Sequence, residues 1–169
     1  NSDGYMRYKD TESGVSPRAL PGLEGYVHVV ATDEHDENSV PLSDEFTHPH
    51  KRRKMVEKRA RKFRNVLNDI LPPEIEGPSD AEVTLIGWGS THGVIHEAIQ
   101  MLAKRGTVAN HLHIKWIVPL HAQHIIDSLA NAKKKIIIEN NNSGQFYRYL
   151  RSETGISIDD HIRKDDGEP

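Results

Sequence analysis

Hydrophobic positions repeat with a helical period between about His48 and Ile70. The apolar residues recur at intervals of four, three, four and three, and they are Val56, Ala60, Phe63, Leu67 and Ile70. This spacing places them on one face of a helix. Pro49 suits the first turn, and Pro72 with Pro73 ends the helix, because a residue that precedes proline is pushed out of helical geometry. The pattern therefore predicts a helix over residues 48–70.

Apolar runs alternate with helical periods after Pro73. Strand patterns occur at residues 82–87, 111–118, 135–139 and 156–158. Helical patterns begin between them at Ser90 or Thr91, at Ala122 and at Gly144, and Gly106 and Gly155 suit the ends of the first and the third. The side chains expected on the inner face of the first helix are Val94, Ile95, Ala98, Ile99 and Leu102. Strands joined by such helices predict an α/β fold with three αβα layers and a mostly parallel sheet.

The segment before these elements is rich in turn residues and poor in apolar periodicity. We expect it to pack as an extended arm against a larger body. The expected division is a turn-rich arm, or the end of a preceding domain, at residues 1–47, a basic linker helix at 48–73, and the α/β domain at 74–169. The start without Met suggests a piece of a longer polypeptide.

Composition limits the class of protein. The 169 residues carry a formal net charge of −3, with 28% charged and 36% hydrophobic residues, which is typical of a globular protein. No apolar stretch approaches the roughly 20 residues of a membrane helix, so we expect no membrane partner and a cytoplasmic location. Because the chain has no cysteine, it can form no disulfide and ligate no iron–sulfur cluster through thiolates.

The predicted helix is strongly basic. Glu57 alone opposes nine cations between residues 51 and 64. Such a helix can bind nucleic acid or steer an acidic electron carrier. The apolar face of the helix and the slightly acidic chain as a whole favour a solvated or subunit-facing helix, so we expect no nucleic-acid partner.

Six motifs occur in an order that resembles one family, the alpha subunits of 2-oxoacid:ferredoxin oxidoreductases. The motifs are Tyr8-Lys9 with Thr11-Glu12, the run 14–22, the cluster 33–37, the run 55–62, the run 87–91, and Glu139-Asn140 with the run 143–145. The resemblance covers nearly the whole chain, but only the C-terminal part of that subunit, including its transketolase C-terminal-like domain. The family's Tyr-Pro-Ile-Thr-Pro-Ser segment, which lies beside thiamine diphosphate, does not occur here, and both ends look trimmed relative to the family.

The resemblance implies part of a complex that oxidatively decarboxylates a 2-oxoacid, forms acyl-coenzyme A and passes electrons to ferredoxin. Thiamine diphosphate, Mg and iron–sulfur clusters are expected in the full complex and none is expected on this segment alone. The implied partners are the beta subunit and other subunits, with ferredoxin and coenzyme A reached through the complex. Since no constellation of nucleophile, base and orienting group is visible, we assign no catalytic residue, and we expect the isolated segment to be inactive.

Two loops are candidates for positioning groups at the rim of the active site. Rigid turns surround Ser16 and Arg18, and we expect Arg18 to pair with a carboxylate or a phosphate. The acidic cluster contains Asp33, His35 and Asp36 and has three interpretations. It can bind a divalent metal, form a solvated acidic loop, or position rim groups through hydrogen bonds from His35 and Asp36.

Two turns at the ends of predicted strands have weaker signals. Gly89, Ser90 and Thr91 open a helix, where backbone N–H groups favour an anion, but the pattern favours a tight turn with a helix cap over an anion site. Glu139 begins an Asn- and Ser-rich turn, and it is either a site residue or a buried carboxylate tied to the Gly144 or Gln145 amide.

The histidines do not define a metal site by their spacing. His121 and His124 lie one helical turn apart, but only two ligands are evident on that face, so we assign no metal ligand. Three classes of function remain open: a segment of an oxidoreductase subunit, a non-catalytic assembly or interaction domain, and a metal- or anion-dependent enzyme in its own right.

Overall fold

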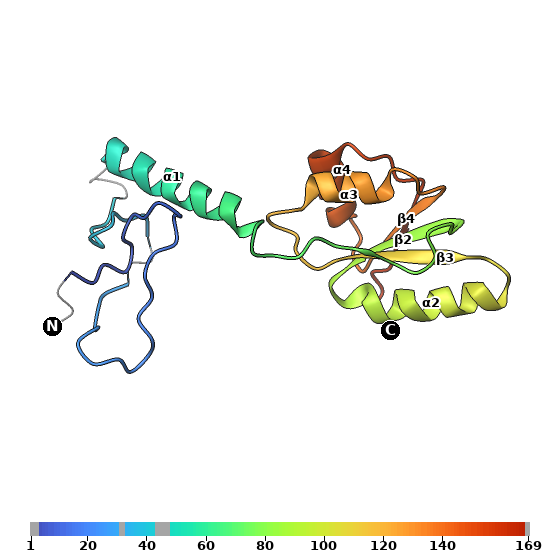
Figure 1. Ribbon diagram of the computed structural model, residues 1–169, viewed down its shortest axis with the longest axis horizontal. Coiled ribbons are helices and arrows are strands. Elements are labelled where there is room, and N and C mark those ends of the chain that lie inside the picture. The colour runs from blue at the N-terminus through green and yellow to red at the C-terminus, as the bar shows by residue number, and fades with distance from the viewer. Residues whose placement is uncertain (1–3, 31–32, 43–47, 168–169) are drawn as a thin grey trace. The chain divides into compact units, whose positions relative to one another are not determined.

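A computed structural model describes residues 4–30, 33–42 and 48–167. The chain divides into two compact units, an N-terminal unit, Asn1–Asp69, and a C-terminal unit, Ile70–Pro169. The first contains one long helix and a non-helical arm, and the second contains a five-stranded sheet (Figure 1). No helix in the described ranges combines the length and the apolarity that a membrane span needs.

Helix α1, Pro49–Val66, is the long helix of the N-terminal unit. Pro49 stands in its first turn, as expected, but the helix ends four residues before Ile70. The N–H groups of Asn68 and Asp69 donate to the carbonyls of Asn65 and Val66 at 3.0 and 2.9 Å, so a tight turn replaces the last predicted turn of helix.

The apolar face of α1 is not the face that the N-terminal unit buries. Val56 and Phe63 are each 47% exposed, whereas Met55 and Lys58 are 2% and 5% exposed. The periodicity therefore predicts the helix correctly and misplaces its covered side. The arm offers carboxylates and backbone carbonyls to α1, and these groups select the cationic face.

The C-terminal unit has five strands in the order β1-β3-β2-β4-β5. β1 pairs antiparallel with β3, and the other neighbouring strands are parallel. The strands are β1 Ile75–Glu76, β2 Val83–Trp88, β3 Ala109–Ile114, β4 Lys135–Glu139 and β5 Asp160–Arg163. The predicted mostly parallel sheet is confirmed.

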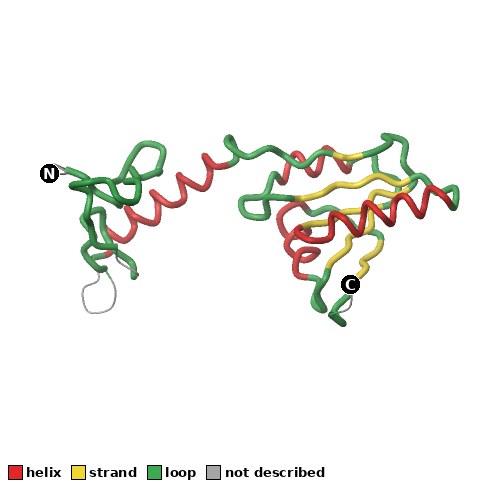
Figure 2. The backbone as a smooth tube through the Cα atoms, turned by 90° about the horizontal axis from the view of Figure 1, so that it is seen from below, coloured by secondary structure: helices red, strands yellow, loops and turns green. Residues whose placement is uncertain are grey.

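Helices cover both faces of this sheet, which completes the three predicted αβα layers. α2, His92–Lys104, lies on one face, and α3, Ala122–Leu129, and α4, Gln145–Thr154, lie on the other (Figure 1). Figure 2 shows α2 crossing the near face of the strands. The core between the sheet, α3 and α4 is built from Ile86, Leu112, Ile114, Leu120, Ile125, Leu129, Ile137, Phe146 and Leu150.

Several predicted details are wrong. The strand expected at 111–118 runs from 109 to 114, and the one expected at 156–158 lies at 160–163. Ile156 and Ile158 pack against the core from a loop, and the Asp159 N–H donates to the Lys135 carbonyl at 2.9 Å, so pairing with β4 starts later. Val94 is 63% exposed because α2 turns the fully buried Ile95 toward the sheet.

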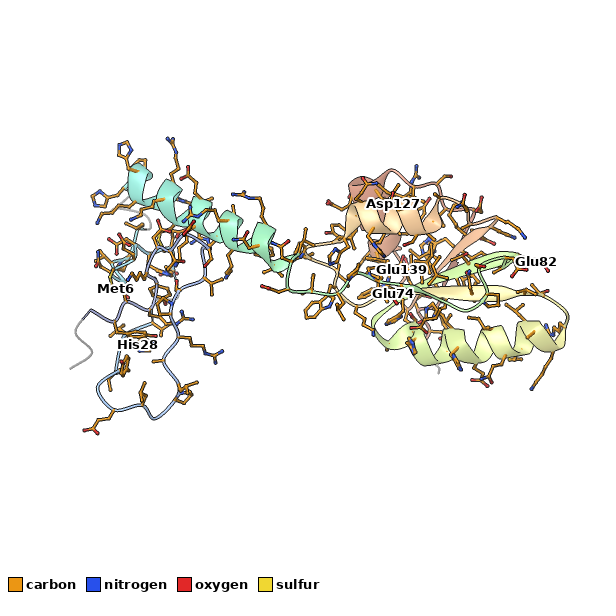
Figure 3. The ribbon with its side chains drawn as sticks, in the orientation of Figure 1. Met6, His28, Glu74, Glu82, Asp127 and Glu139 are labelled. Atoms are coloured by element: carbon orange, nitrogen blue, oxygen red, sulfur yellow. The ribbon has the colours of Figure 1, made fainter. Side chains whose placement is uncertain are left out.

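A fully buried carboxylate, Glu139, joins β4 to the start of α4 (labelled in Figure 3). Its oxygens accept hydrogen bonds from the amides of Phe146 and Tyr147 at 2.8 and 2.9 Å and from the side chain of Asn141 at 2.8 Å. His161 Nε2 lies 3.0 Å from Oε1 without hydrogen-bond alignment, so that contact is electrostatic. The expected buried carboxylate is present, with different amides as its donors.

The environment of Glu139 fixes its charge state. Burial raises the pKa of this carboxyl, but hydrogen bonds from Asn141, Tyr147 and Phe146, together with the nearby His161, outweigh that effect and hold the pKa below its ordinary value. A carboxyl whose pKa is lower in the folded protein stabilises the fold above its unfolded pKa. That stabilisation is lost as the pH falls through the folded pKa.

We expect Glu139→Gln to lower the free energy of unfolding at pH 7 by about 1.5–3 kcal/mol, because charged hydrogen bonds to the α4 amides are lost. The difference from wild type should shrink below the ordinary glutamate pKa of 4.5. Urea unfolding from pH 7 to pH 3 measures this. Glu153→Gln, an exposed change on the same helix, is the control. A deficit that does not vary with pH would contradict the assigned charge.

Candidate functional site

The N-terminal unit contains a basic cleft between its arm and α1. The cleft has a volume of about 380 Å³ and gathers five cationic side chains. Its lining consists of Arg7, Tyr8, Gly14, Val15, Ser16, Arg18, His35, Met55, Lys58, Arg59 and Lys62. Three residues proposed from the sequence, Ser16, Arg18 and His35, therefore share one cleft.

Lys58 holds the arm on α1. Its ammonium donates to the Tyr8 carbonyl at 2.7 Å and to the Ser16 hydroxyl, and the Ser16 hydroxyl in turn donates to the Lys9 carbonyl at 3.0 Å. Burial lowers the pKa of Lys58, and the charge of Asp10 opposes that effect. Lys58 is thus a positioning residue for the strip of arm that carries Ser16.

Arg18 follows Ser16 by two residues in the arm, and its side chain is exposed. Tyr5 stabilises this turn, because its hydroxyl accepts a hydrogen bond from the Ala19 amide at 3.0 Å and lies 3.4 Å from the Pro17 carbonyl. Within the described ranges, the Arg18 guanidinium makes no hydrogen bond or ion pair. A charged fork at the cleft is therefore available to a ligand.

The acidic segment 33–37 is paired with α1. Glu34 accepts two hydrogen bonds from Arg59 at 2.9 and 2.7 Å, and Glu37 binds Lys54 at 2.7 Å. The hydrogen bond from Arg59 lowers the pKa of Glu34, and the one from Lys54 lowers that of Glu37. These two carboxylates pair with cations of α1, so they do not form the solvated acidic loop that was one interpretation of the sequence.

Asp36 shapes its own loop. It accepts hydrogen bonds from Lys51 at 2.8 Å and from the amides of Asn38 and Val40 at 2.9 and 3.0 Å. Burial raises the pKa of Asp36, but these three hydrogen bonds outweigh it and lower the pKa below its ordinary value. Asp36 is therefore an ionised anchor between the loop and α1, and it does not line the cleft.

His35 and Asp33 take different positions. The His35 ring lies 3.7 Å from the Tyr8 ring, centroid to centroid, and its Nδ1 lies 2.7 Å from the Asp33 carbonyl oxygen. Asp33 is exposed, and neither it nor Asp36 belongs to the cleft lining. The first candidate loop therefore contributes Ser16 and Arg18 to the cleft lining, and the second contributes His35.

The run Gly89–Thr91 lies in the C-terminal unit as a single 3₁₀ turn before α2. The Thr91 hydroxyl accepts a hydrogen bond from the Trp88 amide at 3.0 Å and donates to the Trp88 carbonyl at 2.8 Å. Thr91 is 3% exposed, so its hydroxyl is committed to the turn. Only Gly89 and Ser90 remain open to solvent.

Comparisons with known proteins agree on one family. Residues 74–145 match the family model described as transketolase, C-terminal domain. Over 98% of its length, the chain is 33% identical to 28% of a solved 2-oxoglutarate:ferredoxin oxidoreductase from Magnetococcus marinus, with a TM-score of 0.78. It is also 35% identical to subunit alpha of 2-oxoacid:ferredoxin oxidoreductase 2 from Aeropyrum pernix, over 98% of this chain.

The chain belongs to the alpha-subunit family of 2-oxoacid:ferredoxin oxidoreductases. It spans about a quarter of the length of the curated relatives it matches, namely 25% of the Aeropyrum pernix subunit and 26% of one from Saccharolobus solfataricus, to which it is 33% identical. The expected family resemblance is confirmed. The solved relative from Magnetococcus marinus is described with 2-oxoglutarate, coenzyme A and succinyl-CoA bound.

Four cations of this cleft were not predicted as site residues, namely Arg7, Lys58, Arg59 and Lys62. Lys58 and Lys62 are four residues apart and therefore share one face of α1. This spacing is the sequence signal that both lysines face the same side of the helix. It does not stand out in the sequence, because neighbouring positions of the helix are also basic.

The arm of the alpha-subunit segment requires glycine where it crosses α1. Gly14 has φ +79°, and a Cβ there would lie 2.5 Å from the Lys58 carbonyl oxygen and 2.7 Å from the backbone nitrogen of Lys62. Gly22 has a similar φ of +84°, but a Cβ there would meet no atom within 4 Å. Alanine at either position would be strained by the positive φ, but only alanine at position 14 would also clash with α1, so comparing the two variants separates backbone strain from steric contact.

We expect Gly14→Ala to displace the arm, destabilising it by about 1–3 kcal/mol more than Gly22→Ala does, because overpacking adds to the strain shared by both variants. Hydrogen exchange of the residue 5–18 amides, measured by mass spectrometry, should accelerate more in Gly14→Ala than in Gly22→Ala. Equal acceleration in the two variants would show that strain alone accounts for the effect.

Proposed function

We propose that this segment serves a 2-oxoacid:ferredoxin oxidoreductase complex, in which its basic cleft holds an anionic group of a reactant at the active-site rim. The observation that carries the proposal is Arg18, a guanidinium without a described partner beside four other cations. Arg presents a planar fork of donors that suits the carboxylate of a 2-oxoacid or a phosphate of coenzyme A.

The other charges of the cleft divide into occupied and available groups. Lys58 is bound to the arm, and Arg59 is bound to Glu34. Arg7 lies 5.8 Å from the Tyr8 ring centre, and Lys62 makes no hydrogen bond or ion pair with any residue in the described ranges. Arg18, with Arg7 and Lys62 as supporting charges, is the group proposed to contact the anion.

The proposed reaction is oxidative decarboxylation of a 2-oxoacid to acyl-coenzyme A, with electrons passed to ferredoxin in the cytoplasm. In the full complex, thiamine diphosphate with Mg would supply the decarboxylation chemistry and iron–sulfur clusters would supply the electron transfer. The segment has no cysteine, so thiolate ligands for clusters belong to other parts of the complex. The beta subunit and ferredoxin are the proposed partners, and residues 1–47, 48–73 and 74–169 are the proposed functional parts.

We expect Arg18→Gln in the full alpha subunit, assembled in its complex, to raise the KM of one anionic reactant about tenfold, equivalent to ~1.4 kcal/mol, since one charged contact is lost. Ferredoxin reduction is measured while the 2-oxoacid or coenzyme A is varied separately. A selective rise for the 2-oxoacid assigns the carboxylate, and a selective rise for coenzyme A assigns the phosphate.

Arg53→Gln is the matched control, because Arg53 is an exposed cation on α1 outside the cleft. Bound thiamine diphosphate is quantified in both variants, so that loss of cofactor is not mistaken for loss of anion binding. If neither KM changes in Arg18→Gln, the cleft does not hold the reactant.

Subunit assembly is a second candidate function, favoured by the uncovered apolar face of α1. Val56 and Phe63 are exposed there, as are Leu20 and Val27 of the arm, at 73% and 97%. We propose that another subunit of the complex packs against this face.

We expect Phe63→Asp in the full subunit to weaken assembly of the complex, because a charge would enter an apolar contact. Size-exclusion chromatography with multi-angle light scattering measures the assembled fraction. Lys62→Asp, an adjacent charge change on an exposed residue, is the control. An assembled fraction equal to that of wild type in Phe63→Asp would contradict an assembly role for this face.

A further inference from the structure

Histidines gather on the face of the sheet that α2 covers. Glu76 of β1 is the register partner of His111 in β3, so both side chains lie on the same face. His113 follows two residues along the same strand and shares that face. His92 is the first residue of α2. Strand pairing and one helix start therefore bring together residues that are far apart in sequence.

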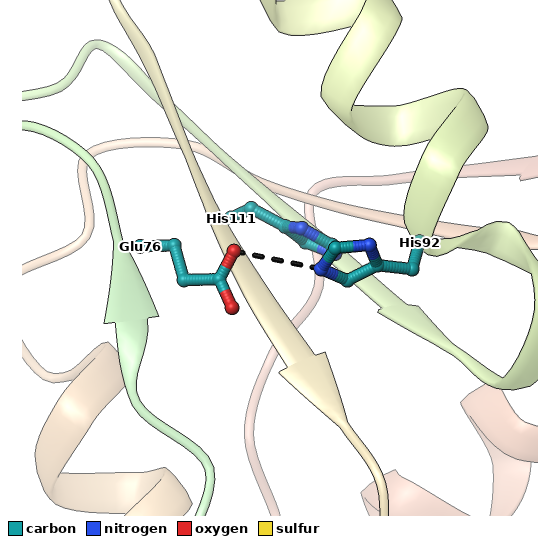
Figure 4. A group of neighbouring side chains, drawn as sticks. All are labelled: Glu76, His92 and His111. Atoms are coloured by element: carbon teal, nitrogen blue, oxygen red, sulfur yellow. Dashed lines mark ion pairs between the residues drawn. The ribbon is translucent and has the colours of Figure 1, made fainter.

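The polar atoms of three of these residues converge. One carboxylate oxygen of Glu76 and one ring nitrogen each of His92 and His111 all lie within 4.8 Å of one another. Figure 4 shows the three side chains meeting, with the His92 Nε2 and the Glu76 Oε2 3.6 Å apart. The His92 ring centre is 5.3 Å from that of His111 and 4.7 Å from that of His113.

The cluster has unpaired polar atoms in its buried half. His111 and His113 are 2% and 8% exposed, and His111 Nε2 and His113 Nδ1 have no hydrogen-bond partner among the described residues. A buried polar atom without a partner costs free energy unless a ligand satisfies it. The buried imidazoles and the open carboxylate above them form an incomplete polar cluster.

We propose that Glu76, His92 and His111 bind a divalent transition-metal ion, with zinc as the best match. Two imidazoles and one carboxylate are a zinc donor set, and three protein ligands leave the fourth tetrahedral position to water or another ligand. The ion would tie β1 and the first turn of α2 to β3.

The movement that coordination needs is small. Bonds of about 2.0–2.2 Å in tetrahedral geometry set ligand atoms roughly 3.3 Å apart, so the atoms must approach from their present spacing. The side chains of His92 and Glu76 are 46% and 52% exposed and can rotate, while buried His111 provides a fixed ligand. Rotation of the His92 and Glu76 side chains would bring their ligand atoms toward His111.

The test is zinc titration of the 169-residue chain after removal of metal with a chelator. Isothermal titration with ZnCl₂ should show one ion per chain, and bound zinc should raise the melting temperature. Glu76→Gln and His92→Gln should each weaken binding about tenfold or more while the metal-free melting temperature stays unchanged. His124→Gln, on α3 at the other face of the sheet, should bind zinc as wild type does.

Co²⁺ provides a second measurement, because its visible spectrum distinguishes tetrahedral coordination from the aquo ion. A tetrahedral spectrum that is lost in His92→Gln supports the site. The proposal is overturned if wild type binds no zinc at micromolar concentration, or if Glu76→Gln and His92→Gln bind it as tightly as wild type. Both exposed variants retain buried His111, so their folding is not at risk. This site is independent of the anion cleft.

Discussion

Burial of the Lys58 ammonium is the interaction on which the candidate site depends. The hydrophobic residues buried in the described part of the N-terminal unit are Leu42 and Met55, too few to give the arm a core of its own. The arm instead takes its shape from polar contacts to α1, and Lys58 is the buried cation among the α1 residues that make them. The position of Ser16, and through the following turn that of Arg18, therefore follows from one buried charge.

The acidic loop and the basic helix are two halves of one electrostatic feature. Glu34, Asp36 and Glu37 bind Arg59, Lys51 and Lys54, so each run of charge finds its partner in the other. Sequence patterns indicated both runs and correctly placed the helix, because helical periodicity is local. They did not indicate the pairing, because a charge pattern carries no information about which distant segment will face it.

The same limit separates what the sequence predicted of the C-terminal unit from what it missed. α3 begins at the predicted Ala122 and β4 has the predicted bounds, since each follows from a short run of its own residues. β1, the donors to Glu139 and the cluster at His111 depend on register between distant segments. Two residues of β1 are too short for a strand pattern, yet their antiparallel pairing with β3 sets Glu76 beside His111.

The motifs that signal the family are largely packing constraints. Gly87 opens one of them, and a Cβ there would clash with Ile95 and lie 2.7 Å from the Thr91 hydroxyl and 3.3 Å from His111 Nε2. Glycine is needed at 87 because α2 and β3 both approach the backbone, whether or not an anion binds the following turn. A shared motif of this kind therefore indicates a shared fold and does not by itself indicate a binding site. Side chains with no role in packing are better candidates for function. Arg18 is such a side chain, because no described residue of the N-terminal unit pairs with its charge.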